Sequence, residues 1–195
     1  MILPILSYGA SILRQECEDF EERIPLDKLI EDMFETMYAA SGVGLAGPQI
    51  GVGNRIFIVD GSPFAEPDEN EKIDEELLEL KDFKKVFINP IIENESGDLW
   101  PFSEGCLSIP GIREEVERKS NIKISYFDEN WSFKEETYKG IPARIIQHEY
   151  DHIEGVLFTD HLNPLKRRLL KRKLEDISKG KVDVNYKMKF KNIKK

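Results

Sequence analysis

Cysteine is scarce in this chain, and long apolar runs are absent. The 195 residues include two cysteines, which cannot form the disulfide framework that holds many small secreted domains together. No apolar run approaches the length of about 20 residues that a membrane-spanning helix needs. The sequence also does not open on a charged segment followed by an apolar one, as a secretory signal would. We therefore expect a cytoplasmic protein that makes no contact with membranes and whose thiols stay reduced.

Internal repeats and a phosphate-binding loop are also missing. Glycines cluster between Gly42 and Gly51, but the segment lacks the Lys-Ser or Lys-Thr ending of a phosphate loop. Hydrophobic residues make up 40% of the chain, which is enough for one domain of ordinary size with its own core. We therefore expect a single domain over residues 1–195.

The hydrophobic pattern predicts an α+β fold. Apolar residues at helical spacing predict a helix near Leu26 to Ala40, with Gly42 as the glycine just past its end. Runs of alternating or continuous apolar residues predict strands at 55–60, 86–92, 122–126 and 132–138. Strands and helices are segregated along the chain, which favours mixed or antiparallel pairing around a central helix. Residues 61–82 are strongly acidic, and we interpret them as a surface insertion.

The central helix carries a His-Glu-x-x-His motif at His148, Glu149 and His152. A spacing of four residues places both imidazoles on one helix face, where they can bind one metal ion. Pro142 suits the first turn and Gly155 the position past the end, and a separate apolar stripe consists of Ile146, Tyr150 and Ile153. The motif predicts a metal-dependent hydrolase.

A catalytic metal of this kind usually takes a third protein ligand. The metzincin pattern places a histidine six residues after the second one, but this chain has Phe158 there. Glu175 is a formal candidate for a thermolysin-like site, although it lies in a basic stretch without a supporting motif. Cys106, within Glu104–Gly111, is the better candidate because a glycine precedes it and an apolar run follows it.

Three segments together resemble the peptide deformylase family. They are residues 42–51, 104–111 and 147–155, they occur in the family's order, and the resemblance extends from near Met1 to about Ile177. Ile153 stands where a leucine is common, but no functional group is missing. The resemblance implies an enzyme of N-terminal processing in protein biosynthesis, which removes the formyl group from formylmethionine on new polypeptides. The alternatives are a zincin-type endopeptidase, which would not need Cys106 or Gln49, and a structural-metal protein, which would not need Glu149 or Gln49.

The residues themselves suggest a division of roles. Cys106, His148 and His152 would hold a divalent ion and leave one position open for water. Glu149 points about 100° away from His148 around the helix, which suits a general base that later acts as an acid. The side-chain amide of Gln49 and the backbone N–H of Leu107 are candidate donors to an oxyanion. Zinc, nickel and cobalt also suit this donor set, and only the resemblance points to ferrous iron.

The resemblance also implies a site for the formylated peptide. Backbone at Val43, Gly44 and Leu45 would pair with the substrate as an added strand. The methionine side chain would enter an apolar pocket near Val43, Ile145 and His148, with Gly105 and Arg113 beside the peptide. Arg113 has an equally good interpretation as a surface charge among neighbouring glutamates.

The C-terminal end is strongly basic. From Leu165 onward it contains thirteen Lys and Arg against three acidic residues, a local balance of +10 in a chain whose net charge is −9. Asn163 as a cap, Pro164 and Gly180 frame a predicted helix over 163–179, followed by a basic tail over 180–195. Its predicted apolar stripe consists of Leu165, Leu169, Leu170, Leu174 and Ile177. The resemblance implies docking on the ribosome rather than on DNA, whereas the simpler interpretation is a solvated helix face.

Overall fold

The computed structural model describes residues 1–65 and 75–191. Residues 66–74 of the acidic segment and 192–195 of the basic tail lie outside the described residues, so the expectations for them are not addressed. Within this part of the chain, one sheet has five antiparallel strands that pair in chain order. They are β2 (Gly44–Ala46), β3 (Ile56–Asp60), β4 (Lys84–Cys106), β5 (Ile109–Phe127) and β6 (Phe133–Lys139). A small parallel pair joins β1 (Ile5–Leu6) to β7 (Met188–Lys189).

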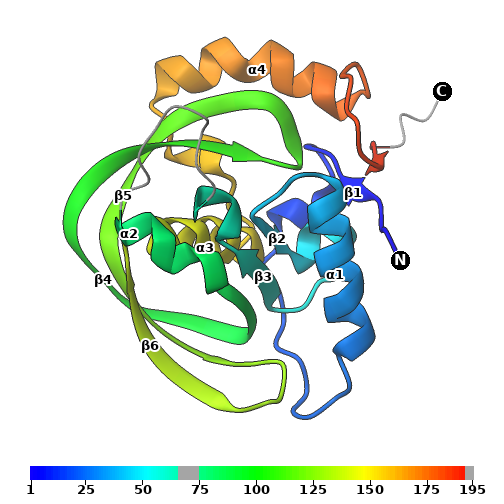
Figure 1. The fold of residues 1–195 in the computed structure, drawn as a ribbon. Coiled ribbons are helices and arrows are strands. Elements are labelled where there is room, and N and C mark those ends of the chain that lie inside the picture. The colour runs from blue at the N-terminus through cyan, green and yellow to red at the C-terminus, as the bar shows by residue number, and fades with distance from the viewer. Residues whose placement is uncertain (66–74, 192–195) are drawn as a thin grey trace.

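Four α-helices and five short 3-10 helices are present in the described residues. The α-helices are α1 (Asp27–Ala39), α2 (Glu75–Leu78), α3 (Gly140–Ile153) and α4 (Pro164–Ser178). The 3-10 helices are η1 (Ser11–Arg14), η2 (Gly47–Ile50), η3 (Ser62–Ala65), η4 (Glu79–Asp82) and η5 (Phe158–His161). Figure 1 shows β4, β5 and β6 curving around α3, with α4 across the top of the view. None of the described helices has both the length and the apolar character needed to cross a membrane.

The core explains why α3 is central. Ile145, Ile146 and Ile153 of this helix pack against buried side chains of β3, β4 and β5, which include Phe57, Phe87, Ile122, Ile124 and Tyr126. Two aromatic rings of that group, Phe57 and Phe87, stack with centroids 4.7 Å apart. The predicted stripe of the motif helix is therefore the face that the sheet encloses, and the α+β expectation is confirmed.

The predicted strands are all present, but two of them are far longer than expected. β4 has 23 residues and β5 has 19, because their ladder continues as far as the pair Cys106 and Ile109. Residues 93–99 of β4 are exposed on both faces. A ribbon in water on both sides needs no alternation of apolar and polar residues, so a hydrophobic pattern cannot reveal it.

The end of α1 differs from the expectation. Ser41, with φ +53°, takes the left-handed conformation, and Gly42 follows it. The Gly42 N–H donates to the carbonyl of Met37 at 2.9 Å and the Ser41 N–H to that of Tyr38 at 3.0 Å, as in a Schellman motif. Gly42 instead lies close to Leu107, because a Cβ there would be 2.8 Å from the Cδ1 atom of Leu107 and that side chain would have to shift.

Helix α4 begins and ends as its sequence predicts. The Asn163 side chain accepts from the Lys166 N–H at 2.9 Å, and Gly180, with φ +74°, follows the last turn. The predicted apolar stripe is wrong for Leu165 and Leu169, which are 67% and 72% exposed. The helix packs on the domain along one narrow line formed by Leu170, Leu174 and Ile177, and Leu169 points about 100° away from Leu170.

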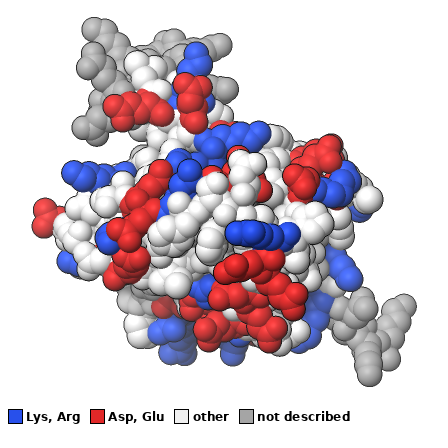
Figure 2. All heavy atoms as spheres, turned by 90° about the horizontal axis from the view of Figure 1, so that it is seen from below, with Lys and Arg blue, Asp and Glu red and all other residues white. Residues whose placement is uncertain are grey.

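Acidic side chains gather on the side of the molecule away from α4. Figure 2 views the molecule from below, opposite to the position of α4 in Figure 1, and shows groups of Asp and Glu with Lys and Arg lying between and beside them.

Gly155 gives a test of how α3 is fixed to the N-terminal segment. Its φ is +71°, and a Cβ there would lie 2.8 Å from the carbonyl carbon of Arg14, which cannot rotate away. Gly140 has a similar φ of +59° but nothing within 4 Å. We expect Gly140→Ala to cost about 1–2 kcal/mol of unfolding free energy through its backbone conformation, and Gly155→Ala about 1–3 kcal/mol more through the clash. Urea titration of both variants measures the difference, and equal costs would show that the clash is relieved.

Candidate active site

Two elements, β4 and α3, bring the three expected metal ligands together. Cys106 is the last residue of β4, and His148 and His152 lie one turn apart on α3. Their ligand atoms lie within 4.8 Å of one another, and Cys106 Sγ is 3.3 Å from His152 Nε2. Glu175, the alternative third ligand, lies on α4 and does not belong to this group. One thiol and two imidazoles at this spacing can hold a single metal ion.

Glu149 lies beside this group and is buried. Its side chain is 4% exposed, and Oε2 has no hydrogen-bond partner among the described residues. Burial raises the pKa of Glu149 to about 7, although the imidazoles of His148 and His152 oppose this rise. A carboxylate with such a pKa can accept and release a proton near neutral pH.

Gly44 is what makes room for this carboxylate. A Cβ at Gly44 would lie 2.7 Å from Cγ and Cδ of Glu149, closer than real side-chain contacts come. Glu149 therefore rests against bare backbone of β2. The family resemblance implies a role for Gly44 in substrate pairing, but nothing in the sequence indicates its contact with Glu149.

The surroundings of Cys106 favour its ionised form, the thiolate. Burial disfavours the thiolate, but the neighbouring imidazoles of His152 and His148 outweigh that effect and lower the pKa of Cys106 to about 5. The thiolate is the form of cysteine that binds metals. The electrostatics of the site therefore suit a metal ligand at this position.

Gln49 and Leu107 flank the same group. The Gln49 Oε1 atom accepts from the Ala46 N–H at 2.9 Å, which turns Nε2 toward Ser108 Oγ at 3.2 Å and Cys106 Sγ at 3.5 Å. Leu107 follows Cys106 in the turn between β4 and β5, and its N–H donates to no acceptor within the described part of the chain. Two donors therefore border the space beside the cysteine.

A cleft of about 540 Å³ opens in front of these groups. Five of the six expected peptide-binding residues line it: Val43, Gly44, Gly105, Arg113 and Ile145. Leu45, the sixth, is fully buried in the core beneath the cleft. Its strand β2 is nevertheless the first strand of the sheet, so one of its edges is not paired by another strand of that sheet.

A buried ionic network supports the site, and the sequence did not reveal it. Glu104 accepts from Arg118 at 2.7 and 3.0 Å and from Arg144 at 2.9 Å, and it lies 2.9 Å from His148 Nδ1. Glu104, Arg118 and Arg144 are all less than 10% exposed. Although burial opposes ionisation, His148 and Arg118 hold the pKa of Glu104 far below its usual range. The only signal in the sequence was Arg144 among apolar neighbours, which does not identify its partner.

The network fixes the orientation of a ligand ring. Because Nδ1 of His148 faces the Glu104 carboxylate, Nε2 is left to face the cysteine and His152. The network continues to the surface, since Arg118 also pairs with Asp151 at 2.8 Å and Asp151 lies 2.7 Å from His161 Nε2. His161 is thus the outer end of a chain of interacting side chains that begins at His148 and runs through Glu104, Arg118 and Asp151.

Comparisons with known proteins agree on one family. A model of the family described as polypeptide deformylase matches residues 2–168. A peptide deformylase of Christiangramia forsetii is 54% identical over 100% of this chain and 99% of its own length, and one of Flavobacterium psychrophilum is 53% identical over 97% of each. The crystal structure of a peptide deformylase from Legionella pneumophila is 37% identical, covers 93% of this chain and 98% of its own, and has a TM-score of 0.76. These similarities do not favour the zincin alternative.

Glu104 provides a test of the network. Glu104→Gln leaves two buried guanidinium groups without their shared carboxylate, and we expect it to lower the free energy of unfolding by about 3–5 kcal/mol. Glu114→Gln is the matched control, because Glu114 pairs with Lys166 at the surface, and we expect less than about 1 kcal/mol. Denaturant titration of metal-free protein measures both. A small cost for Glu104→Gln would show that the guanidinium groups find other partners.

Proposed function

Because the chain belongs to the peptide deformylase family, we propose that Cys106, His148 and His152 hold the divalent metal with which it removes the formyl group from new polypeptides. The enzyme is a hydrolase that acts on formylmethionyl nascent peptides and releases formate. The observation that carries the assignment of ligands is the convergence of one sulfur and two ring nitrogens within 4.8 Å, beside a buried carboxylate.

The donor set fits a divalent ion with an open position. One thiolate and two neutral imidazoles leave room for a fourth ligand, and the Oε2 atom of Glu149 beside them is buried without a partner among the described residues. When bound, such an ion supplies a Lewis acid that makes water acidic enough to react near neutral pH. We propose ferrous iron as the native ion, although zinc, nickel and cobalt suit the same ligands.

We assign the proton transfers to Glu149. Its unpartnered Oε2 and its raised pKa suit a base that takes a proton from the attacking water and then gives it to the leaving amine. We assign stabilisation of the oxyanion, which forms on the formyl oxygen, to two donors. They are Nε2 of Gln49 and the N–H of Leu107, because both border the space beside Cys106.

The cleft suits an extended peptide with an apolar first side chain. We propose that the open edge of β2 at Gly44 and Leu45 pairs with the substrate backbone and that Val43 and Ile145 contact the methionine side chain. Arg113 donates to the Ser103 carbonyl at 2.8 Å, and a Cβ at Gly105 would lie 3.1 Å from its Nη1 atom. Gly105 therefore leaves Arg113 free to lie along the wall of the cleft, where it can reach the peptide beyond methionine.

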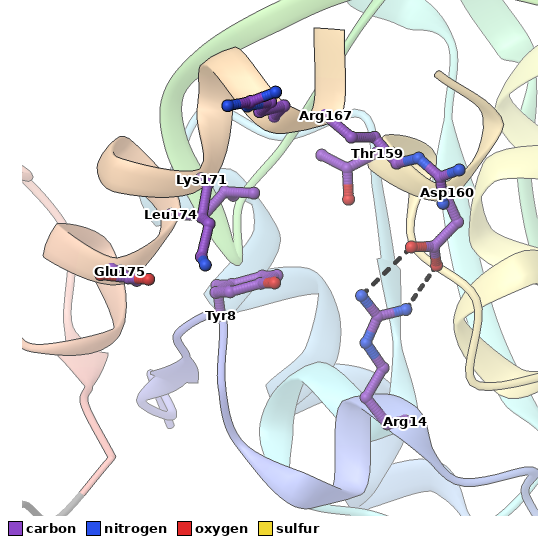
Figure 3. A pocket seen from close by; sticks show the side chains of 9 residues that line it. Tyr8, Arg14, Thr159, Asp160, Arg167, Lys171, Leu174 and Glu175 are labelled. Atoms are coloured by element: carbon purple, nitrogen blue, oxygen red, sulfur yellow. Dashed lines mark hydrogen bonds and ion pairs between the residues drawn. The ribbon is translucent and has the colours of Figure 1, made fainter. Parts of the chain in front are cut away.

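We propose that α4 carries the enzyme to the ribosome. Its cations Arg167, Arg168 and Lys171 form no ion pair within the described residues, and they line a hollow of about 440 Å³. Figure 3 shows that Arg167 and Lys171 face Tyr8 and the ion pair of Arg14 with Asp160 across this hollow. Unpaired cations on one surface attract RNA phosphates.

We further propose that residues 1–195 are one domain that works in the cytoplasm. The first and last described strands pair with each other, so the two ends of the chain are joined in one structure. Ala65 and Leu80, in the two described parts of the acidic segment 61–82, are buried, and residues 66–74 between them lie outside the described residues.

Replacement of Glu149 tests the assigned base. We expect Glu149→Gln to keep the metal and to lower turnover of a formyl-Met peptide by about 10²–10⁴-fold, because the water then lacks its proton acceptor. Formate release and metal content are measured anaerobically on the same sample. Cys106→Ser is the companion variant and should lose or exchange the metal, because a hydroxyl replaces a thiolate poorly. Near-normal turnover in Glu149→Gln, or full metal content in Cys106→Ser, would contradict these roles.

Charge reversal on α4 tests the ribosome proposal. We expect replacement of Arg167, Arg168, Arg172 and Lys173 by glutamate to abolish co-sedimentation with ribosomes at low salt and to leave hydrolysis of a short formyl peptide unchanged. The control reverses Arg23, Lys81, Lys119 and Lys139, which are exposed and lie outside α4, for the same change in net charge. Equal loss of binding in both variants would indicate that only net charge matters. Loss of hydrolysis in the α4 variant would show that the helix supports the site.

A further inference from the structure

The chain returns to the active site after α4. Residues beyond Gly180 run back along the N-terminal segment, where β7 pairs with β1. The Ile5 N–H donates to the Lys187 carbonyl at 2.8 Å, and the Ser7 N–H donates to the Lys189 carbonyl at 3.0 Å. The family match ends at residue 168, so this tail lies outside the matched region.

The tail places one side chain at the cleft. Tyr186 lines the 540 Å³ cleft, and its hydroxyl donates to the carbonyl oxygen of Leu107 at 2.6 Å. Its ring is half-buried against the core cluster that contains Ile5 and Met37, together with Leu107 and Met188. A tyrosine hydroxyl is protonated at neutral pH, so it acts as a donor here.

Leu107 and Ser108 form the turn that follows Cys106, and three distant segments hold it. The carbonyl of Leu107 accepts from Tyr186, and that of Ser108 accepts from the Tyr8 N–H at 2.8 Å. The Ser108 hydroxyl accepts from Gln49 Nε2 at 3.2 Å. The Ser108 carbonyl depends on a backbone donor, and the Leu107 carbonyl depends on one side chain. Tyr186 is therefore the contact that a substitution can remove without changing the backbone.

We propose that Tyr186 is a positioning residue for deformylation, which fixes the turn so that the Leu107 N–H points at the oxyanion. The proposal rests on the role assigned above to that N–H. An oxyanion donor works only when it lies about 2.7–3.1 Å from where the charge develops. The Cα of Leu107 joins this carbonyl to the amide nitrogen of the same residue, so the bond from Tyr186 holds the backbone from which the N–H projects. Without that bond the turn is free to shift at Leu107, and the N–H loses its direction toward the oxyanion.

A positioning role differs from two other roles that Tyr186 could have. If the hydroxyl only stabilised the tail, its loss would lower the thermal midpoint but leave kcat and KM unchanged. If the ring were only a wall of the cleft, loss of the hydroxyl would change neither constant, and loss of the ring would raise KM. A misplaced oxyanion donor instead lowers kcat with little effect on KM, because the interaction forms only in the transition state.

The test uses Tyr186→Phe in the full-length enzyme loaded with metal. We expect kcat for a formyl-Met tripeptide to fall by about 10-fold, less than the 10²–10³-fold that complete loss of an oxyanion donor costs. KM and metal content should stay within about two-fold, since the Leu107 carbonyl contributes neither a metal ligand nor a substrate contact. Tyr126→Phe is the matched control, because that buried hydroxyl donates to Glu136 at 2.5 Å and does not line the cleft.

A second variant separates the hydroxyl from the docking of the tail. Met188→Ala weakens packing of β7 but keeps the Tyr186 hydroxyl, and we expect it to lower the thermal midpoint but to keep kcat. The proposal would be overturned if kcat of Tyr186→Phe were unchanged, if its kcat fell only in proportion to lost metal, or if its KM alone rose. An equal fall of kcat in Met188→Ala or Tyr126→Phe would also overturn it. Wild type and Glu149→Gln in the same assay test the proposed function separately, because failure there would appear as an inactive wild type or an active glutamine variant.

Discussion

The buried charge of Glu104 is the interaction on which the candidate active site depends. A carboxylate with 4% exposure is stable only when cations surround it, and Arg118 from β5, Arg144 from α3 and His148 provide them. The same contacts tie β4, β5 and α3 together at the point where the ligands converge. The energy that keeps Glu104 ionised therefore also orients the ring of His148, which is why the metal site and the fold cannot be separated at this position.

Close contact between backbone and side chains gives the rest of the site its shape. Gly44 allows Glu149 to lie directly against β2, and the turn at Leu107 and Ser108 is held by three segments that are distant in the sequence. A rigid turn suits hydrolysis, because donors that are already oriented need no reorganisation when charge develops. The N-terminal segment and the C-terminal tail thus act as a frame for the active site rather than as loose ends.

The distribution of charge suggests a second level of organisation. The cleft and its ligands lie in the body of the molecule, whereas the unpaired cations lie on α4, which packs on that body along Leu170, Leu174 and Ile177. Long-range attraction to phosphate requires an exposed positive surface, and hydrolysis requires a shielded pocket. The exposed cations and the shielded pocket lie on different elements, so each meets the physical requirement of the role proposed for it.

The sequence by itself determined the elements with strong local signals. Helical spacing predicted α1, α3 and α4, and the glycines and prolines at the ends of α3 and α4 predicted the boundaries of those two helices. The motif containing His148, Glu149 and His152 predicted the chemistry. The choice of Cys106 over Glu175 also came from the sequence, because three ordered motifs are more specific than one.

Only the tertiary structure decided the rest. The length of β4 and β5, the network around Glu104, the contact of Gly44 with Glu149 and the return of Tyr186 to the cleft all join residues that are far apart in the chain. Hydrophobic periodicity reports whether a residue faces the core, but it does not identify the partner of a buried charge or the neighbour of a glycine. Those depend on the path of the whole backbone, which no local pattern contains.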